Sequence, residues 1–401
     1  MGHAVVIGSV VVLTSGVCAG QPGPGSLDWK TLEAPVLTDH VQLTDRDTFL
    51  KAGEAYFSPD GGWIIFQAVL APEAGESASE HYSMFVAELI RDSRGAITGL
   101  ETPIEISPRG SANTCGWFHP TERGVVLLGS TLVEPNAIDA PGYERQGGRY
   151  KWAFPSEMEI TTVRVPEMLG EPVAGERAIP TLLFERAGYD AEGSWSADGR
   201  FVLYAHVDEA KTRLIGRPEA DIWIFDTRTE EHYPLVTAPG YDGGPFFSPD
   251  GTAICYRSDR RGDDLLQLYV AELAFNDDGV PVAIKAEHSM TANGHVNWAP
   301  FWHPSGAFMV YGTSELGHFN YEVFAVEADT TKPVGELRRA RVTSSNGADV
   351  LPVFSPDGRH MMWTGQRGPL GEGDTRPTSQ LWIARFDGRT LFAEQAIKAT
   401  P

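Results

Sequence analysis

Positive charge and cysteine are both scarce in this sequence. Its 401 residues include 32 Lys and Arg against 54 Asp and Glu, a formal net charge of −22. Because phosphate binding needs an excess of Lys and Arg, this balance argues against a nucleic-acid-binding protein. The three cysteines, Cys18, Cys115 and Cys255, are far apart, so no zinc site or disulfide framework is expected. Cys115 and Cys255 are predicted to be unpaired, mostly buried thiols.

Long apolar runs are also missing. The stretch from Ala4 to Val17 has 14 residues, whereas a membrane-spanning helix needs about 20. We therefore expect residues 1–19 to be a signal peptide that is removed, leaving no transmembrane span and a periplasmic or secreted protein. Cys18 leaves lipidation open, although Val17 is not a residue that lipoprotein signals place before their cysteine. Residues 20–40, rich in Gly and Pro at their start, are predicted to be a linker.

The motifs of several enzyme classes do not occur. The sequence has no Gly-x-Ser-x-Gly elbow, no phosphate loop and no His-Glu-x-x-His pair. Serine hydrolases, nucleotide-binding enzymes and zinc proteases are therefore disfavoured, and no catalytic residue is assigned. What the sequence does contain is 43 Gly and 28 Pro, which favours many tight turns.

A short turn phrase recurs six times. Measured at the Pro position, the intervals are 61, 77, 52, 55 and 52 residues. This period, with several short β-rich runs in each unit, is typical of propeller blades. The six copies are Phe57-Ser58-Pro59-Asp60-Gly61, Phe118-His119-Pro120, Trp195-Ser196-Ala197-Asp198-Gly199, Phe247-Ser248-Pro249-Asp250-Gly251, Trp302-His303-Pro304-Ser305-Gly306 and Phe354-Ser355-Pro356-Asp357-Gly358.

The runs between the turns predict an all-β fold. We expect a six-bladed β-propeller of four-stranded antiparallel blades over residues 41–401, with the large aromatic residue of each phrase between blades. An open ring would leave strand edges unpaired, so one terminus must supply the last strand. Residues 41–44 and 396–400 both fit that strand, and we favour the N-terminal segment.

The turn phrase, its spacing and the aromatic and aliphatic strand that follows resemble the repeat of TolB-like β-propellers, a PD40 or WD40-like repeat, from Val41 nearly to the C-terminus. Two departures occur in the second copy, which has an extra residue before Gly124 and a long insertion between its second and third strands. The resemblance implies a six-bladed periplasmic propeller that binds other macromolecules without catalysis. Such proteins are often named for biopolymer transport on fold similarity alone.

One position in the repeat carries Asp or Asn in five of the six copies. It lies seven residues before the Pro position, just ahead of the innermost strand, so we expect the side chains around one mouth of the central channel. Either each side chain caps its own turn, or together they form an oxygen-rich site for Ca²⁺ or another divalent cation, or for cationic groups of a ligand. The candidate ligand-binding residues are Asn113, Asp190, Asp242, Asn297 and Asp349, with Glu192 two residues after Asp190.

The long loops between second and third strands should frame the same mouth. Aromatic and cationic residues in these loops suit contacts with a sugar or a peptide, unless they pack on the neighbouring blade. The candidate loop contacts are Arg149, Lys151, Arg257, His318 and Arg367.

The sequence therefore favours an exported, non-catalytic binding or scaffold protein of the cell envelope. Its partner would be an envelope protein or an oligosaccharide or peptide ligand, and not nucleic acid. The alternative is a metal-assisted polysaccharide lyase or hydrolase on the same face, because His206 and His318 are expected there. His119 and His303 replace the Ser of the turn phrase and are predicted to be structural.

Overall fold

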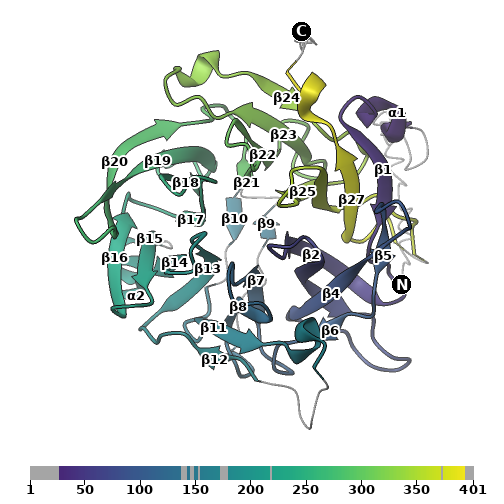
Figure 1. The fold of residues 1–401 in the computed structure, drawn as a ribbon, viewed down its shortest axis with the longest axis horizontal. Helices are drawn as coiled ribbons and strands as arrows, with labels where there is room; N and C mark the ends of the chain where they lie inside the picture. Colours follow the sequence, from purple (N-terminus) through teal and green to yellow (C-terminus); the bar gives the residue numbers. More distant parts are fainter. Residues whose placement is uncertain are drawn as a thin grey trace, which may run out of the picture.

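A ring of six β-sheets surrounds a central channel (Figure 1). The computed structural model describes residues 27–392 apart from 137–141, 145–148, 152–153, 172–178, 217–218 and 372–373. The predicted signal peptide and Cys18 lie outside the described residues. In the part that is described, no helix is long and apolar enough to cross a membrane. The six-bladed, four-stranded antiparallel architecture predicted from the repeats is confirmed.

Each blade runs from an inner strand to an outer one. Blade 1 contains β2 (Phe49–Phe57), β3 (Trp63–Leu70), β4 (Ser83–Arg91) and, both beside β4, β5 (Ile97–Leu100) and β6 (Ile104–Glu105). Blade 2 contains β7 (Asn113–Phe118), β8 (Val125–Ser130), β11 (Glu159–Arg164) and β12 (Thr181–Leu182). Blade 3 contains β13 (Tyr189–Trp195), β14 (Phe201–Val207), β15 (Ala220–Asp226) and β16 (Glu231–Val236).

Blade 4 contains β17 (Asp242–Phe247), β18 (Ala253–Ser258), β19 (Gln267–Phe275) and β20 (Pro281–Ser289). Blade 5 contains β21 (Asn297–Trp302), β22 (Phe308–Thr313), β23 (Glu322–Glu327) and β24 (Arg339–Arg341). Blade 6 contains β25 (Asp349–Phe354), β26 (His360–Gly365), β27 (Gln380–Phe386) and β1 (Leu37–Gln42). Outside the blades are α1 (Trp29–Glu33), α2 (Glu209–Ile215), β9 (Gly142–Glu144), β10 (Arg149–Lys151) and the short helices η1 (Pro166–Leu169), η2 (Val334–Glu336) and η3 (Gly388–Thr390).

The N-terminal segment closes the ring. Strand β1 pairs antiparallel with β27, placing Val41 opposite Ile383, so the predicted N-terminal closure is confirmed. The strand starts at Leu37 and α1 precedes it, so the whole helix and the start of the strand lie within the range 20–40 that was expected to be linker. Residues 396–400, the other candidate, lie outside the described residues.

The turn phrase forms the tight turn that its residues predict. In the first copy the Ser58 hydroxyl donates to Asp60 Oδ1 at 2.6 Å and accepts from the backbone N–H of Trp63 at 2.9 Å. Gly61 has a φ of 65°, a conformation that glycine adopts without steric cost. His119 takes the place of the serine in the second copy, where Nδ1 accepts from the N–H of Glu122 at 2.9 Å. The predicted structural role of His119 is thereby confirmed.

The aromatic residues of the phrase pack between blades. Trp195 of blade 3 belongs to one buried cluster with Leu127 and Ile160 of blade 2. Trp302 and Phe354 occupy corresponding places in later interfaces. Full burial of such a side chain contributes about 1.5 to 3 kcal/mol. Phe57 and Phe247 are only partly buried and contribute less. Cys115 and Cys255 are not in disulfides, as predicted, although Cys115 is only partly buried.

Candidate functional site in the central channel

A β-bulge interrupts every inner strand at the same point. In β2 the pairing register shifts between Gly53 and Ala55, and the other five inner strands shift equivalently. A bulge of this kind redirects a side chain, and a non-glycine residue with positive φ costs about 1 kcal/mol or more. We call the six bulged residues the bulge ring: Glu54 (φ 42°), Cys115 (48°), Glu192 (59°), Gly244 (58°), Ala299 (53°) and Leu351 (54°).

The bulge ring is polar on one side and apolar on the other. Blades 1 to 3 contribute Glu54, Cys115 and Glu192, whereas blades 4 to 6 contribute Gly244 and two apolar residues. The Cys115 thiol donates to Glu54 Oε1 at 3.0 Å. The hydroxyl of Tyr241 donates to Glu192 Oε1 at 2.6 Å. Polar groups of neighbouring blades therefore bind one another inside the channel.

Arg257 fills the place that Gly244 leaves open. It extends from β18, and a Cβ added at Gly244 would lie 1.8 Å from Arg257 Nη1. Its Nη2 lies 3.2 Å from Glu192 Oε2 and donates to the Tyr241 hydroxyl at 2.7 Å. We call Glu54, Cys115, Glu192, Tyr241 and Arg257 the channel cluster. It contains two carboxyl groups and one guanidinium.

Burial governs the protonation of the channel cluster. Burial raises the pKa of Glu54 and the nearby charge of Glu192 adds to it, against the Cys115 hydrogen bond and Arg257, which lower it. Burial also raises the pKa of the Cys115 thiol well above its usual value, with Glu54 and Glu192 adding to the effect. Since a thiolate is the reactive form of cysteine, Cys115 is an inert thiol at neutral pH.

Aromatic rings fill the channel beside the bulge ring. Tyr56, Trp117, Phe246 and Phe301, each two residues beyond a bulge, come from four blades and have ring centroids 4.9 to 6.3 Å apart. We call them the aromatic plug. Packing across the axis at these distances closes the channel at this level.

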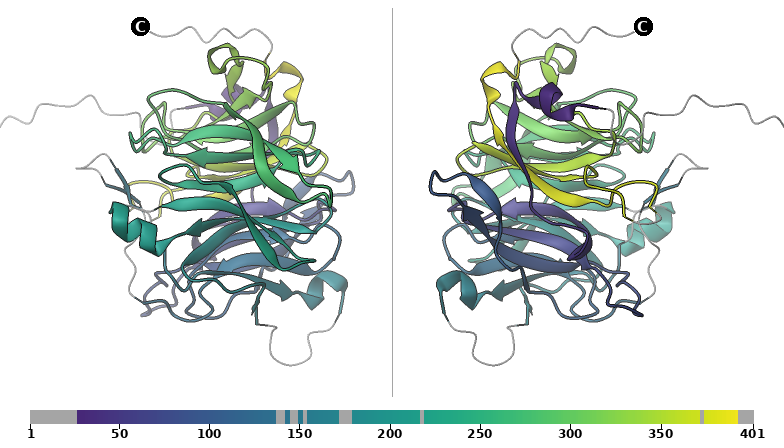
Figure 2. Two further views of the ribbon diagram at one scale, coloured as in Figure 1. Left: turned by 90° about the vertical axis from the view of Figure 1, so that its left-hand side faces the viewer. Right: turned by 90° about the vertical axis from the view of Figure 1, so that its right-hand side faces the viewer.

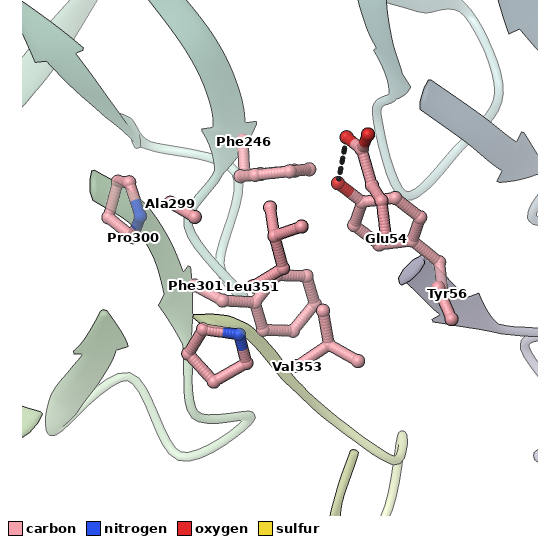
Figure 3. A pocket seen from close by; sticks show the side chains of 10 residues that line it. Glu54, Tyr56, Phe246, Ala299, Pro300, Phe301, Leu351 and Val353 are labelled. Atoms are coloured by element: carbon pink, nitrogen blue, oxygen red, sulfur yellow. Dashed lines mark hydrogen bonds between the residues drawn. The ribbon is translucent and has the colours of Figure 1, made fainter. Parts of the chain in front are cut away.

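A small pocket lies against the aromatic plug. Figure 3 shows Glu54, Phe246 and Leu351 directed towards it, with the Tyr56 hydroxyl donating to Glu54 Oε1 at 3.2 Å. The cavity volume is about 10 Å³, which is room for about one water molecule. Sites for drug-sized ligands need roughly 300 to 1,000 Å³, so this pocket is too small for an oligosaccharide as it stands.

The five Asp and Asn residues predicted to ring the channel mouth are buried between the blades instead. Each lies opposite a residue of the second strand in the ladder, as Asp190 lies opposite His206, and this register directs the side chain into the blade interface. Asp190 Oδ1 lies 2.8 Å from His206 Nδ1, and Asp242 accepts from Arg260 Nη2 at 2.9 Å. These five side chains therefore do not form the predicted open ring of oxygens at the channel mouth. Of the candidate ligand-binding residues, only Glu192 reaches the channel. The others in the set are Asn113, Asn297 and Asp349.

The predicted loop contacts are scattered. Arg257 belongs to the channel cluster, and Arg367 is fully buried in ion pairs, so neither is a surface loop contact as expected. Arg149 and Lys151 lie in β10, which pairs with β9, and their side chains are outside what is described. His318 lies in the loop before β23, and burial lowers its pKa, with His295 adding to the effect.

His206 and His318 are in different blades, as their sequence positions indicate. In the described residues, no group of three or more His, Cys, Asp or Glu side chains is placed to hold a metal ion. The cation site proposed from the sequence therefore has no ready ligand set in this part of the chain.

Sequence reasoning missed the aromatic plug, although a signal exists. The residue three before the Pro position is aromatic in four of six copies: Tyr56, Trp117, Phe246 and Phe301. A β-bulge cannot be predicted from the alternation of polar and apolar residues along a strand. The position five residues before Pro, which forms the bulge ring, therefore showed no comparable sequence pattern. The role of Arg257 depends on the missing side chain at Gly244, a relation between two different strands.

Curated proteins similar to this chain include two called Tol-Pal system protein TolB. The protein from Wolinella succinogenes is 26% identical over 254 residues, covering 62% of this chain and 53% of that protein. The protein from Nitratidesulfovibrio vulgaris is 28% identical over 125 residues, covering 31% and 24%. The chain thus spans about half the length of the first relative. No protein-family model matches it.

The chain also aligns with solved structures. TolB from Acinetobacter baumannii aligns with a TM-score of 0.49 at 16% identity, covering 82% of this chain and 64% of that one. An oligogalacturonate lyase in complex with manganese aligns with a TM-score of 0.41 at 12% identity, covering 88% and 96%. At these identities the likeness concerns the fold alone.

Six four-stranded blades around a channel filled by an aromatic plug define this protein as a β-propeller. The repeated Ser-Pro-Asp-Gly turns are the sequence feature in which this chain resembles TolB-like β-propellers. Together with the two TolB relatives, these turns make the chain similar to TolB-like β-propellers.

Proposed function

We propose that the protein is an exported, non-catalytic propeller that binds another macromolecule of the cell envelope. The observation that carries this proposal is the aromatic plug, whose four rings pack against one another across the channel and leave little room for a substrate between them. The reactive groups nearby are engaged internally: the Cys115 thiol with Glu54, and Arg257 with Glu192. Export rests on the predicted signal peptide.

The partner is a protein, bound through the loops that join second to third strands. In antiparallel blades these loops share one face, where β9, β10 and α2 project (Figure 2). Leu214 of α2 is 87% exposed, and Val133 and Leu316 are exposed in loops of blades 2 and 5. We take these exposed apolar side chains as the contacts that a protein partner would use.

The names of the relatives suggest which partner to test first. They place TolB in a Tol-Pal system, so the Pal component of the same cell is the first candidate for this chain. The test is the affinity of purified protein for immobilised Pal. We expect Leu214→Ser with Ile215→Ser to weaken binding about tenfold or more, as loss of a central apolar contact does.

A matched control lies on the opposite face. Phe275 ends β19 there and is exposed, so Phe275→Ser should leave the affinity unchanged. Equal binding by both variants would reject the loop face as the interface, and no binding by the parent protein would reject Pal as the partner.

The alternative, a metal-assisted lyase or hydrolase of acidic polysaccharide, has weaker support. His206 is bound to Asp190 in a blade interface, and the loop of His318 belongs to a different blade. Turnover of an acidic oligosaccharide by purified protein with Mn²⁺ or Ca²⁺ would favour this alternative.

A further inference from the structure

The blade interfaces share a repeated polar pair. In blades 2 to 5, one residue of the third strand lies in register with the second-strand residue that is opposite the Asp or Asn position. In blade 3 these three residues are Asp190, His206 and Asp221. That third-strand side chain meets the Asp or Asn of the next blade. At the interface of blades 4 and 5 both members are amides, and Asn297 Nδ2 donates to Gln267 Oε1 at 3.0 Å.

Three interfaces place two carboxyl groups in this position instead. The pairs are Glu159 with Asp190, Asp221 with Asp242, and Glu322 with Asp349, and in each the charge of one member raises the pKa of the other. Two buried carboxylates that face one another cannot both ionise unless a cation or a proton offsets the repulsion.

Two of these pairs have permanent cations. Between blades 3 and 4, Lys211 Nζ lies 2.9 Å from Asp221 and Arg260 lies 2.9 Å from Asp242. Between blades 5 and 6, Arg341 lies 2.8 Å from Glu322 and Arg367 lies 2.5 Å from Asp349. Each carboxyl of these two pairs therefore has an ion-pair partner of its own.

The pair between blades 2 and 3 differs. Glu159 Oε2 and Asp190 Oδ2 are buried, and neither has a hydrogen-bond partner among the described residues. The guanidinium of Arg186, whose charge lowers the pKa of Glu159, donates to the Tyr204 hydroxyl and lies 4.2 Å from the centre of the Trp223 ring. The remaining bond of Asp190 is to His206, which is charged only when protonated.

The charges around Glu159 favour retention of a proton. Burial and then the charge of Asp190 raise the pKa of Glu159 to about 8; Glu185 also raises it, and the backbone N–H and charge of Arg186 oppose the rise. Tyr204 and His232 complete the surroundings on β14 and β16, and burial, Arg186 and His206 together lower the pKa of His232 to about 4. His232 is therefore neutral where Glu159 titrates.

We infer that Glu159 keeps a proton beside the Asp190 carboxylate, that this proton holds blades 2 and 3 together, and that the interface loosens when the proton leaves in mildly alkaline solution. A carboxyl that binds its proton more tightly in the folded protein stabilises the fold fully below the unfolded pKa, and this contribution is lost as pH rises through the folded pKa. For Glu159 the loss runs from about pH 4.5 to about pH 8.

The interface leads directly to the channel. The backbone N–H of Asp190 donates to the carbonyl of Met158, the residue before Glu159, at 2.9 Å. Met158 is in one buried cluster with Tyr189, Tyr241 and Phe154, and Phe154 lies 5.9 Å from Tyr241 between ring centroids. Because Tyr241 donates to Glu192, a change in the packing of blades 2 and 3 is transmitted to the channel cluster.

Hydrogen exchange of the full chain, corrected for the intrinsic rate at each pH, tests this inference. Between about pH 6 and pH 9 we expect peptides covering 158–164 and 189–195 to exchange roughly tenfold faster, as local opening does when it is destabilised. Peptides covering 267–275 and 297–302, at the amide pair, should show no such increase. Glu159→Gln, which places an amide as at Gln267, should abolish it, and Glu185→Gln should not.

Three results would overturn the inference. The first is that hydrogen exchange at blades 2 and 3 does not increase with pH. The second is that Glu159→Gln shows the same increase as the parent protein. The third is that Ca²⁺ or Mn²⁺ suppresses the increase, which would assign the pair to a metal. If Glu159→Gln does not fold, infrared spectroscopy of the parent protein supplies the readout. The band of a protonated carboxylic acid should fade near pH 8, and Asp190→Asn should make it fade at lower pH.

Discussion

Arg367 binds Glu33 in the interior of the protein, with Nη2 2.6 Å from Oε1 and neither side chain exposed to solvent. The same guanidinium lies 2.5 Å from Asp349 Oδ2, so it connects the N-terminal helix α1 to the innermost strand of blade 6. The N-terminus is therefore fixed to the ring by a buried ion pair as well as by the strand β1.

Removing the carboxylate of Glu33 should weaken this closure strongly. Glu33→Ala leaves a buried guanidinium with one partner fewer, and breaking a buried pair costs about 3 to 5 kcal/mol. Urea unfolding should report a loss of this size in the free energy of unfolding. Glu76→Ala, at an exposed position, should have almost no effect. Equal effects of the two substitutions would contradict the role given to Glu33.

Deleting residues 20–45 should remove the outer strand of blade 6 and expose the edge of β27. The melting temperature should fall by several degrees or more, because a loss of 1 kcal/mol alone shifts a domain by a few degrees. Scanning calorimetry measures this shift. If removal of residues 393–401 is the more damaging truncation, the N-terminal strand is not the principal closure.

Gly244→Ala tests the approach of Arg257 to the bulge ring. The new Cβ would lie 1.8 Å from Nη1, so the guanidinium must leave Glu192, and we expect a loss above about 2 kcal/mol in the free energy of unfolding. Gly251→Ala is the matched control: its φ is 72°, and nothing lies within 4 Å of its Cβ. The control should cost only about 1 kcal/mol. Equal losses would show that backbone conformation alone matters at Gly244.

Stability should be highest between mildly acidic and neutral pH. The hydrogen bonds from His40 and Arg367 outweigh burial and lower the pKa of Glu33, so its contribution is complete above the unfolded pKa and is lost as pH falls below about 4.5. Glu159 acts in the opposite sense as pH rises towards about 8. The melting temperature should depend less on pH on the acid side in Glu33→Gln, and less on pH on the alkaline side in Glu159→Gln. A parent protein that keeps gaining stability up to pH 9 would contradict this account.

The repeat made most of the fold predictable, because Ser, Pro, Asp and Gly each have a local reason to form the turn, as Ser58 and Asp60 show. The site was much less predictable. The burial of Asp190 depends on its register against His206, and the place of Arg257 depends on an absent side chain in another strand. Neither relation is local in sequence. The bulge at Glu54 likewise breaks the alternation from which strand faces are inferred.

The central claim is that the protein binds a macromolecule and does not transform one. Calorimetric titration of the purified protein tests it most directly, first with the Pal component and then with acidic oligosaccharides and Mn²⁺. The account predicts a saturable heat of binding with Pal that the Leu214→Ser, Ile215→Ser variant loses, and no sustained heat with the oligosaccharides. A steady heat of turnover on the oligosaccharides, with none on Pal, would contradict it.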